Sequence, residues 1–407
     1  MNPRLVLMRM ARRLARSEML TSAYARLLEL RARLFLSRSS GPVVAILSLG
    51  KNGHSYSAAR AARALGLKVV MVSPEPVLAE LAYSNYLVRL NPLDDTSEVI
   101  ERLRPLQVQA ALISVKHLIL PAQIKVAEAL GLVSSGQKAS DLANDKLAWR
   151  KAMEAAGLTQ QAYSESYSDL RDRPVVRKPR SGTSSIGVFY LEPGSDAEIQ
   201  RIQSDGQPDL FEEYVDGEQF DVEGFSRDGV HHTLTIVKEK YKRTGNEFPP
   251  KYFHFNPAHD AAFLKMAEEK AFQVLDASGI RNGAWHVEMR HLDGDFMPLD
   301  FANRMGYERF ITRSSGVDFG QQHVAAFIPG LEIPFERKPR RMVQYFATEK
   351  EEYEIFKRIV EEHPSSVFDA RMEPFRMSTM LYYGMIVVEA ETNEKLFEML
   401  HGLTFEV

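Results

Sequence analysis

Four short apolar runs that alternate with helical segments constrain the fold of this chain more than any other feature. The runs occupy residues 43–49, 67–73, 86–90 and 110–115. Helical patterns lie between them, at about 55–65 and 97–103. Strands that are apolar along their length are typical of parallel sheets covered by helices on both faces. We therefore predict a doubly wound α/β domain over residues 41–135.

The absence of cysteine from all 407 residues excludes several functional classes. A disulfide scaffold, a thiolate-bound metal and a cysteine nucleophile are ruled out. The length suits two to three domains, and no apolar run reaches the roughly 18 residues of a membrane helix. We therefore expect a globular protein of the reducing cytoplasm, attached to a membrane at most peripherally.

The first 40 residues differ in charge from the rest of the chain. They contain nine arginines and two glutamates, a net charge of +7, against −10 for the remaining residues. Leucines recur among the arginines at roughly helical spacing. We therefore predict a basic arm of one or two amphipathic helices over residues 1–40.

Three roles of this arm stay open. A basic amphipathic helix can bind an anionic membrane surface or an acidic partner. It can equally pack on its own chain, or on a second copy in a homo-oligomer, with its arginines in water. An organellar transit peptide is the third alternative, which the modest serine content disfavours. We expect no nucleic-acid partner.

The pattern beyond residue 135 is that of α+β structure. We predict a helix over about 140–156, strands within 175–188 and 209–240, a helix over 259–279 and a hairpin over 283–305. Residues 331–341 are typical of a linker. The C-terminal segment has the order of a split βαβ domain, with strands at 342–347, 366–371, 382–390 and 403–407 and helices at 350–361 and 393–401. The predicted domains are thus 41–135, 136–330 and 331–407, after the arm.

Two candidate motifs present lysines beside small polar residues. Asn144-Asp145-Lys146-Leu147 opens a helix, and a strand from Val175 delivers Lys178 to a loop. That loop contains Ser181, Gly182, Thr183, Ser184 and Ser185. Its backbone N–H groups and hydroxyls can bind phosphate oxygens, and a lysine supplies positive charge. The alternative is a polar hairpin loop with a surface lysine.

A third candidate motif is an extended stretch followed by an acidic turn. Glu212, Glu213, Tyr214 and Val215 lead into Asp216-Gly217. Free backbone groups of such a stretch can bind an adenine edge, and an acidic side chain just beyond it can accept from ribose hydroxyls. An ordinary acidic turn between strands is the alternative.

The fourth motif is a hairpin that carries two carboxylates. Asp293-Gly294 is a type I′ turn signal, and it places position 288 across from 299. Glu288 and Asp300 then lie within a residue of each other, where carboxylate oxygens suit Mg²⁺. Arg304 would add a fixed positive charge where an oxyanion develops. Alternatively, the two carboxylates are bridged to Arg290 or Arg304.

In this order and spacing, the four motifs resemble the ATP-grasp superfamily, especially its carboxylate-amine ligases, over roughly residues 41–330. The resemblance implies ATP held between two sheets, a hinge near 212–216 and one or two Mg²⁺ ions on Glu288 and Asp300. Its implied nucleotide-binding residues are Lys146, Lys178, Ser181, Gly182, Thr183, Ser184, Ser185, Glu212, Glu213, Tyr214, Val215 and, at the ribose, Gln219. Arg304 and Lys178 are the implied catalytic residues.

The resemblance also implies a reaction. A ligase of this kind transfers the γ-phosphoryl group of ATP to a small-molecule carboxylate, and an amine then attacks the acylphosphate. Three positions depart from the family pattern: Asp300 stands where a longer glutamate is usual, Ala302 where an asparagine metal ligand is usual, and Gln219 where a glutamate binds ribose. These departures, together with the basic arm, keep open the alternative of an ATP-binding structural or regulatory protein. A small-molecule kinase on the same scaffold, which stops at phosphoryl transfer, is a third alternative.

Overall fold

A computed structural model describes residues 18–35, 41–52, 55–182, 186–202, 208–377 and 380–405. The predictions that concern residues 1–17, 36–40 and the loop residues Thr183, Ser184 and Ser185 lie outside the described residues. Among the described residues, no helix combines the length and the apolar character that crossing a bilayer requires.

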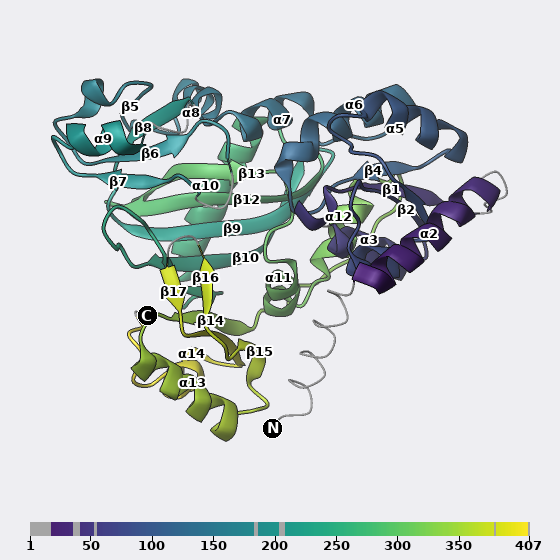
Figure 1. Ribbon diagram of the computed structural model, residues 1–407. Helices are drawn as coiled ribbons and strands as arrows, with labels where there is room; N and C mark the ends of the chain where they lie inside the picture. The colour runs from purple at the N-terminus through teal and green to yellow at the C-terminus, as the bar shows by residue number, and fades with distance from the viewer. Residues whose placement is uncertain are drawn as a thin grey trace.

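The N-terminal α/β unit is a parallel sheet with helices on its faces, as predicted (Figure 1). Its strand order is β3-β2-β1-β4. The strands are β1 (Val43–Leu47), β2 (Lys68–Val72), β3 (Tyr86–Val88) and β4 (Ala110–Leu112). The α-helices are α3 (Tyr56–Ala64), α4 (Leu78–Ala82), α5 (Thr96–Leu103) and α6 (Leu120–Leu130). Strands β1 and β2 are buried almost throughout, which explains their apolar sequences.

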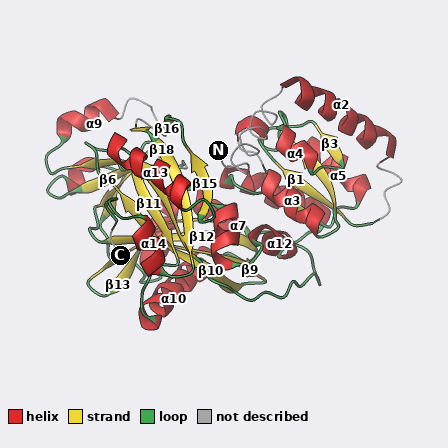
Figure 2. Cartoon of the chain, turned by 90° about the horizontal axis from the view of Figure 1, so that it is seen from below, coloured by secondary structure: helices red, strands yellow, loops and turns green. Residues whose placement is uncertain are grey.

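The described part of the basic arm is one helix, α2 (Glu18–Phe35), which packs against β3 and α4 (Figure 2). Ala25 and Leu28 are buried there, whereas Leu27 and Leu30 are about half exposed. Glu29 pairs with Arg89 of the α/β unit at 2.5 Å. For residues 18–35 these contacts favour packing on the chain's own body, and membrane binding by the arm stays a prediction.

Adjacent leucines of α2 offer a test of this packing. We expect Leu28→Ala to lower the free energy of unfolding by about 3 kcal/mol, because Leu28 is fully buried. Leu27→Ala, at 50% exposure, is the matched control and should cost less than about 0.5 kcal/mol. Urea unfolding of both variants measures the difference. Equal effects would contradict the docking of α2.

The predicted helix over 140–156 is wrong in one respect, because it is two helices. α7 (Gln137–Asn144) ends and α8 (Lys146–Ala155) begins at Asp145, whose backbone is extended. The Asp145 carboxylate accepts hydrogen bonds from the N–H groups of Leu147 and Ala148, so it caps α8. The break places Lys146 in the first turn of α8, as the Asp-Lys motif indicates.

A small antiparallel sheet follows, in the order β5-β8-β6-β7. It consists of β5 (Tyr163–Ser164), β6 (Val175–Pro179), β7 (Phe189–Leu191) and β8 (Asp209–Glu213), with α9 (Asp196–Ile202) between β7 and β8. Lys178 therefore lies on β6, as predicted, and Glu212 lies on its neighbour β8.

An antiparallel sheet of eight strands forms the centre of the molecule (Figures 1 and 2). Its order is β13-β12-β9-β10-β11-β14-β18-β15. Its first five strands are β9 (Glu218–Arg227), β10 (Val230–Tyr241), β11 (Pro250–Phe255), β12 (Gly283–Leu292) and β13 (Asp295–Ala302). Phe220, Val222 and Val287 on one face of these strands share a core with α10 (Ala261–Ser278). The opposite face of β9, β12 and β13 carries polar residues, among them Asp221, Glu288 and Asp300.

The C-terminal strands continue this sheet. They are β14 (Arg341–Ala347), β15 (Val367–Arg371) and β18 (Gly384–Ala390), covered by α13 (Lys350–Glu362) and α14 (Asn393–Met399). A short hairpin of β16 (Phe375–Met377) and β17 (Met380–Tyr382) was not expected. The predicted last strand is wrong in its described part, because residues 403–405 lie outside any strand. The domain limits themselves stay a prediction.

The α/β unit contacts the large sheet where β13 ends. The Met305 N–H donates to the Ser114 carbonyl at 2.9 Å, and His323 of α12 (Phe319–Ala325) contacts the Ile113 carbonyl at 2.7 Å. Arg60 pairs with Glu308 of α11 (Glu308–Ser315) at 2.6 Å. The loop that follows β4 is thereby held beside the polar face of the sheet.

Candidate active site

One face of the large sheet carries the ionisable residues. Directly opposed residues of an antiparallel pair project to the same side, and so do alternate residues of one strand. Glu288 of β12 is opposite both Asp221 of β9 and Asp300 of β13. His286 is opposite Glu223 in the same way. The register therefore brings these five side chains to one side of the sheet, away from α10.

The hairpin register differs from the prediction by one residue. Pairing runs regularly from the turn to Met289 opposite Pro298, and it then shifts so that Glu288 faces Asp300. Leu299 is the extra residue of a β-bulge. Glu288 and Asp300 are consequently direct partners across the two strands, whereas a regular hairpin would offset them by one residue.

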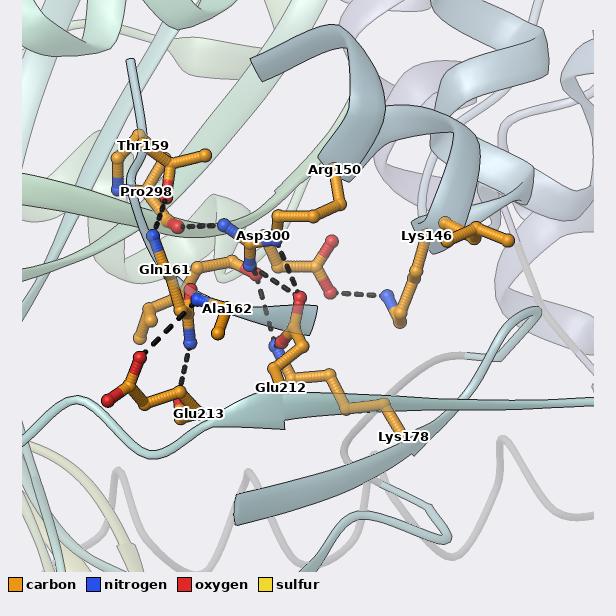
Figure 3. Close-up of polar contacts among 12 residues, drawn as sticks. Lys146, Arg150, Thr159, Gln161, Ala162, Lys178, Glu212, Glu213, Pro298 and Asp300 are labelled. Carbon is orange, nitrogen blue, oxygen red and sulfur yellow. Dashed lines mark hydrogen bonds and ion pairs between the residues drawn. The ribbon is translucent and has the colours of Figure 1, made fainter. Parts of the chain in front are cut away.

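Lys146 neutralises one of these two carboxylates. Its ammonium group forms an ion pair with Asp300 (Figure 3). Burial raises the pKa of Asp300, but Lys146 and Lys178 outweigh it and hold that pKa well below its usual value. Burial and the negative charge of Asp300 raise the pKa of Glu288 instead. Asp300 is therefore the more readily ionised carboxylate and Glu288 the less readily ionised one, as expected for two neighbouring carboxylates that share no cation.

Lys178 belongs to a buried network with Arg150 and Glu212 (Figure 3). The Glu212 carboxylate is 2.6 Å from Nζ of Lys178 and 2.6 Å from Nη2 of Arg150. Burial raises the pKa of Glu212, and the two cations lower it by more, so the net shift is downward. The Glu212 side chain is therefore engaged with Arg150 and Lys178, and only its backbone groups could make the predicted contact with adenine.

The rest of the predicted adenine stretch is fixed by its neighbours. The Glu213 N–H donates to the Ala162 carbonyl at 2.8 Å, and the Tyr214 ring stacks on Phe248 with a centroid distance of 6.1 Å. Arg290 donates to the Val215 carbonyl. Gln219 donates to the Glu239 carboxylate at 3.1 Å. The amide at the predicted ribose position is therefore engaged on the sheet face.

The start of the predicted phosphate loop lies close to α8. The Lys146 N–H donates to the Arg180 carbonyl at 2.9 Å, and Arg180 pairs with Asp145 at 2.5 Å. Ser181, which follows, is exposed, and Gly182 is partly exposed. The structure thus brings the first residues of this loop beside Lys146.

Arg304 lies beyond the end of β13 and not on it, which the sequence could not fix. A Cβ atom at Gly306 would lie 3.0 Å from Nη1 of Arg304 and 3.5 Å from Nδ1 of His286. Glycine at 306 therefore leaves room for the guanidinium group. Burial, followed by the charges of Arg304 and Lys146, lowers the pKa of His117 to about 4. His117, from the α/β unit, thus faces the same site as a neutral imidazole.

Sequence analysis missed three buried acids, Asp221, Glu223 and Glu239, each less than 5% exposed. One carboxylate oxygen of Asp221 and one of Glu223 have no hydrogen-bond partner. Burial and then Glu288 raise the pKa of Glu239 to about 7, although Tyr241 donates to it at 2.7 Å. Polar residues at alternate positions of otherwise apolar strands are the signal that could have revealed this acidic face.

The raised pKa of Glu239 predicts a pH-dependent stability. Ionised Glu239 destabilises the folded state as pH rises from about 4.5, its unfolded value, to about 7. We expect Glu239→Gln to raise the free energy of unfolding by about 1–3 kcal/mol at pH 8 and to leave it unchanged at pH 4. Urea unfolding at both pH values measures this, with exposed Glu361→Gln as the control. A gain of the same size at pH 4 would contradict the assignment.

The two paired carboxylates fit Mg²⁺ that arrives with a nucleotide. Within the described ranges, no three or more His, Cys, Asp or Glu side chains are grouped so that they could hold a metal ion. Mg²⁺ is commonly bound by one or two carboxylates together with phosphate oxygens and water. Glu288 and Asp300 supply that number of carboxylates, and Lys146 and Lys178 lie near enough for their charges to lower the pKa of each.

The chain has the ATP-grasp fold that the resemblance implies, because solved structures of a ligase and a synthetase superimpose on most of it. An L-amino acid ligase from Bacillus licheniformis superimposes with a TM-score of 0.70, covering 89% of this chain and 96% of that structure at 20% identity. N5-carboxyaminoimidazole synthetase from Staphylococcus aureus, complexed with ADP, gives 0.66 at 13% identity, covering 90% and 98%.

Sequence comparison finds relatives named as a ligase and a synthase. A D-alanine–D-alanine ligase of Granulibacter bethesdensis is 34% identical over 176 residues, which are 39% of this chain and 55% of that protein. Dapdiamide A synthase of Enterobacter agglomerans is 28% identical over 144 residues, or 32% and 33% of the two chains. The chain thus matches about half or less of the length of these relatives. No protein-family model matches it.

Proposed function

We propose that this protein is an ATP- and Mg²⁺-dependent ligase that joins a small-molecule carboxylate to an amine. The observation that carries the proposal is that two lysines from separate elements act on two carboxylates that a β-bulge makes direct partners: Lys146 pairs with Asp300, and the charge of Lys178 acts on both Glu288 and Asp300. A nucleotide triphosphate with Mg²⁺ supplies the complementary charges. The ligase names of the sequence relatives and the fold of the structural neighbours support the same chemistry.

In this proposal the chain's residues act by placing charge. Lys146 and Lys178 bind phosphate oxygens, and Glu288 and Asp300 hold Mg²⁺, which neutralises the phosphates when bound. Arg304 stabilises the negative charge that develops on the carboxylate substrate during transfer. Phosphoryl transfer requires mainly this positioning and charge stabilisation.

The substrates are a carboxylate, such as an amino acid, and an amine. The carboxylate receives the γ-phosphoryl group and becomes an acylphosphate. The amine nitrogen then attacks the acyl carbon, phosphate leaves, and a C–N bond forms as the nitrogen loses a proton. ADP and phosphate are the other products.

The test is an assay of the full-length protein with ATP, Mg²⁺ and pairs of amino acids, read by phosphate release and by mass spectrometry of the products. We expect phosphate release that depends on a substrate pair, with a dehydrated adduct of the two. Binding of ATP without phosphate release across a broad panel would instead indicate a regulatory ATP-binding protein. A stable phosphorylated carboxylate without adduct would indicate a kinase.

A further inference from the structure

Arg150 links three elements of the candidate site from a fully buried position. Its side chain comes from the middle of α8 and has no exposed surface (Figure 3). Nε donates to Glu212 of β8 at 2.7 Å. Nη1 donates to the Pro298 carbonyl at 2.8 Å, and Nη2 to the Leu299 carbonyl at 3.3 Å. All three nitrogen atoms of the guanidinium group are therefore engaged.

The two carbonyls that Arg150 binds belong to the β-bulge of β13. Leu299 is the extra residue, and Pro298 is the last residue before it in the regular ladder. The Leu299 carbonyl also accepts a hydrogen bond from Lys178 at 3.1 Å. Buried carbonyls without partners are costly, so a bulge in this place needs donors from outside the sheet. Arg150 and Lys178 supply such side-chain donors to these two carbonyls.

The bulge decides on which face of the sheet Asp300 lies. Without it, the ladder that starts at the turn would pair position 300 with Val287 in place of Glu288. Val287 is fully buried in the core beneath α10. A regular hairpin would therefore turn the Asp300 carboxylate into an apolar core and away from Lys146 and Glu288.

We propose that Arg150 is a positioning residue that holds the β-bulge and thereby keeps Asp300 opposite Glu288. The hydrogen bond from Arg150 to Glu212 holds that carboxylate in place, and the carboxylate in turn pairs with Lys178. One side chain thus sets the geometry of both the metal-binding carboxylates and a phosphate-binding lysine. The consequence for nucleotide chemistry rests on the proposed function, whereas the effect on hairpin register does not.

The register can be measured by disulfide trapping, because the chain contains no cysteine that would interfere. Disulfides form only when the two Cα atoms are within about 7 Å of each other and the Cβ atoms face each other. The pair Glu288→Cys/Asp300→Cys reports the bulged register, and Val287→Cys/Asp300→Cys reports the regular one. With Arg150 present, we expect the first pair to oxidise readily and the second not to oxidise.

Arg150→Met should reverse this preference. We expect oxidation of the 288/300 pair to slow by at least about tenfold and the 287/300 pair to become trapped. Arg150→Lys, which keeps the charge but offers one donor group to the same oxygens, should give an intermediate result and guards against failure of the methionine variant to fold. Lys151→Met, at the exposed neighbouring position, is the control and should change nothing. Unchanged trapping in both Arg150 variants would overturn the proposal.

Metal binding separates this inference from the proposed function. In the otherwise unsubstituted protein, we expect Arg150→Met to weaken Mn²⁺ binding in the presence of a non-hydrolysable ATP analogue by about tenfold, measured by water-proton relaxation. If the parent protein binds no Mn²⁺ with the analogue, the proposed function fails while the trapping result still decides the role of Arg150. If both proteins bind Mn²⁺ equally, Arg150 does not position the carboxylates.

Discussion

Glu288→Gln is expected to lower ATP-dependent phosphate release by about 10³-fold while leaving the protein folded and at least as stable as the parent. The loss follows because an uncharged amide is a poor substitute for a carboxylate that holds Mg²⁺ against phosphate oxygens. The gain in stability follows because burial and Asp300 already disfavour the charged form of Glu288, as its raised pKa indicates. Activity and stability therefore move in opposite directions.

Steady-state phosphate release and thermal unfolding measure the two effects on one preparation. Glu361→Gln makes the same chemical change at an exposed position of α13 and should leave both unchanged. A variant at Glu288 that loses stability and activity together would show that the residue has a structural role. A variant with full activity would remove Glu288 from the proposed metal site.

Much of the fold could be predicted because the decisive signals are local. The apolar runs at β1 and β2 lie in a sheet buried on both faces, and such runs need no knowledge of distant residues. The Asp293-Gly294 turn is local in the same sense, and both residues have the positive φ of a type I′ turn. The positions of Lys146 at a helix start and of Lys178 on a strand could be predicted for similar reasons.

The remaining features depend on partners far away in sequence. The bulge at Leu299 rests on donors from Arg150 and Lys178, more than a hundred residues earlier. The role of Glu212 follows from the same two cations, which is why its side chain could not be assigned from its own stretch. Asp221 and Glu223 lie in a strand whose polar face becomes evident only when the register of β9 against β12 is known.

The two lysines and their carboxylates also suggest how ATP and Mg²⁺ depend on each other. Lys146 is paired with Asp300 and Lys178 with Glu212, so each lysine already has an anionic partner. If ATP alone takes Lys146 for its phosphates, Asp300 loses its ion-pair partner beside additional negative charge. If Mg²⁺ alone takes Asp300, Lys146 loses its partner in a partly buried site. Together the two ligands exchange partners without leaving a charge unpaired, which makes their binding mutually favourable.

Asp300→Asn should therefore separate binding from turnover. Without Mg²⁺, we expect this variant to bind ATP about tenfold more tightly than the parent, because Lys146 is free and the repelling carboxylate is gone. Added Mg²⁺ should no longer improve ATP affinity, and phosphate release should fall by about 10²-fold or more because a metal ligand is lost. Calorimetry with and without Mg²⁺ measures the coupling.

Asp293→Asn, the same change at the exposed turn of the same hairpin, is the matched control, since asparagine tolerates the positive φ of that position. Weaker binding of Mg²⁺-free ATP by Asp300→Asn would contradict the exchange of partners.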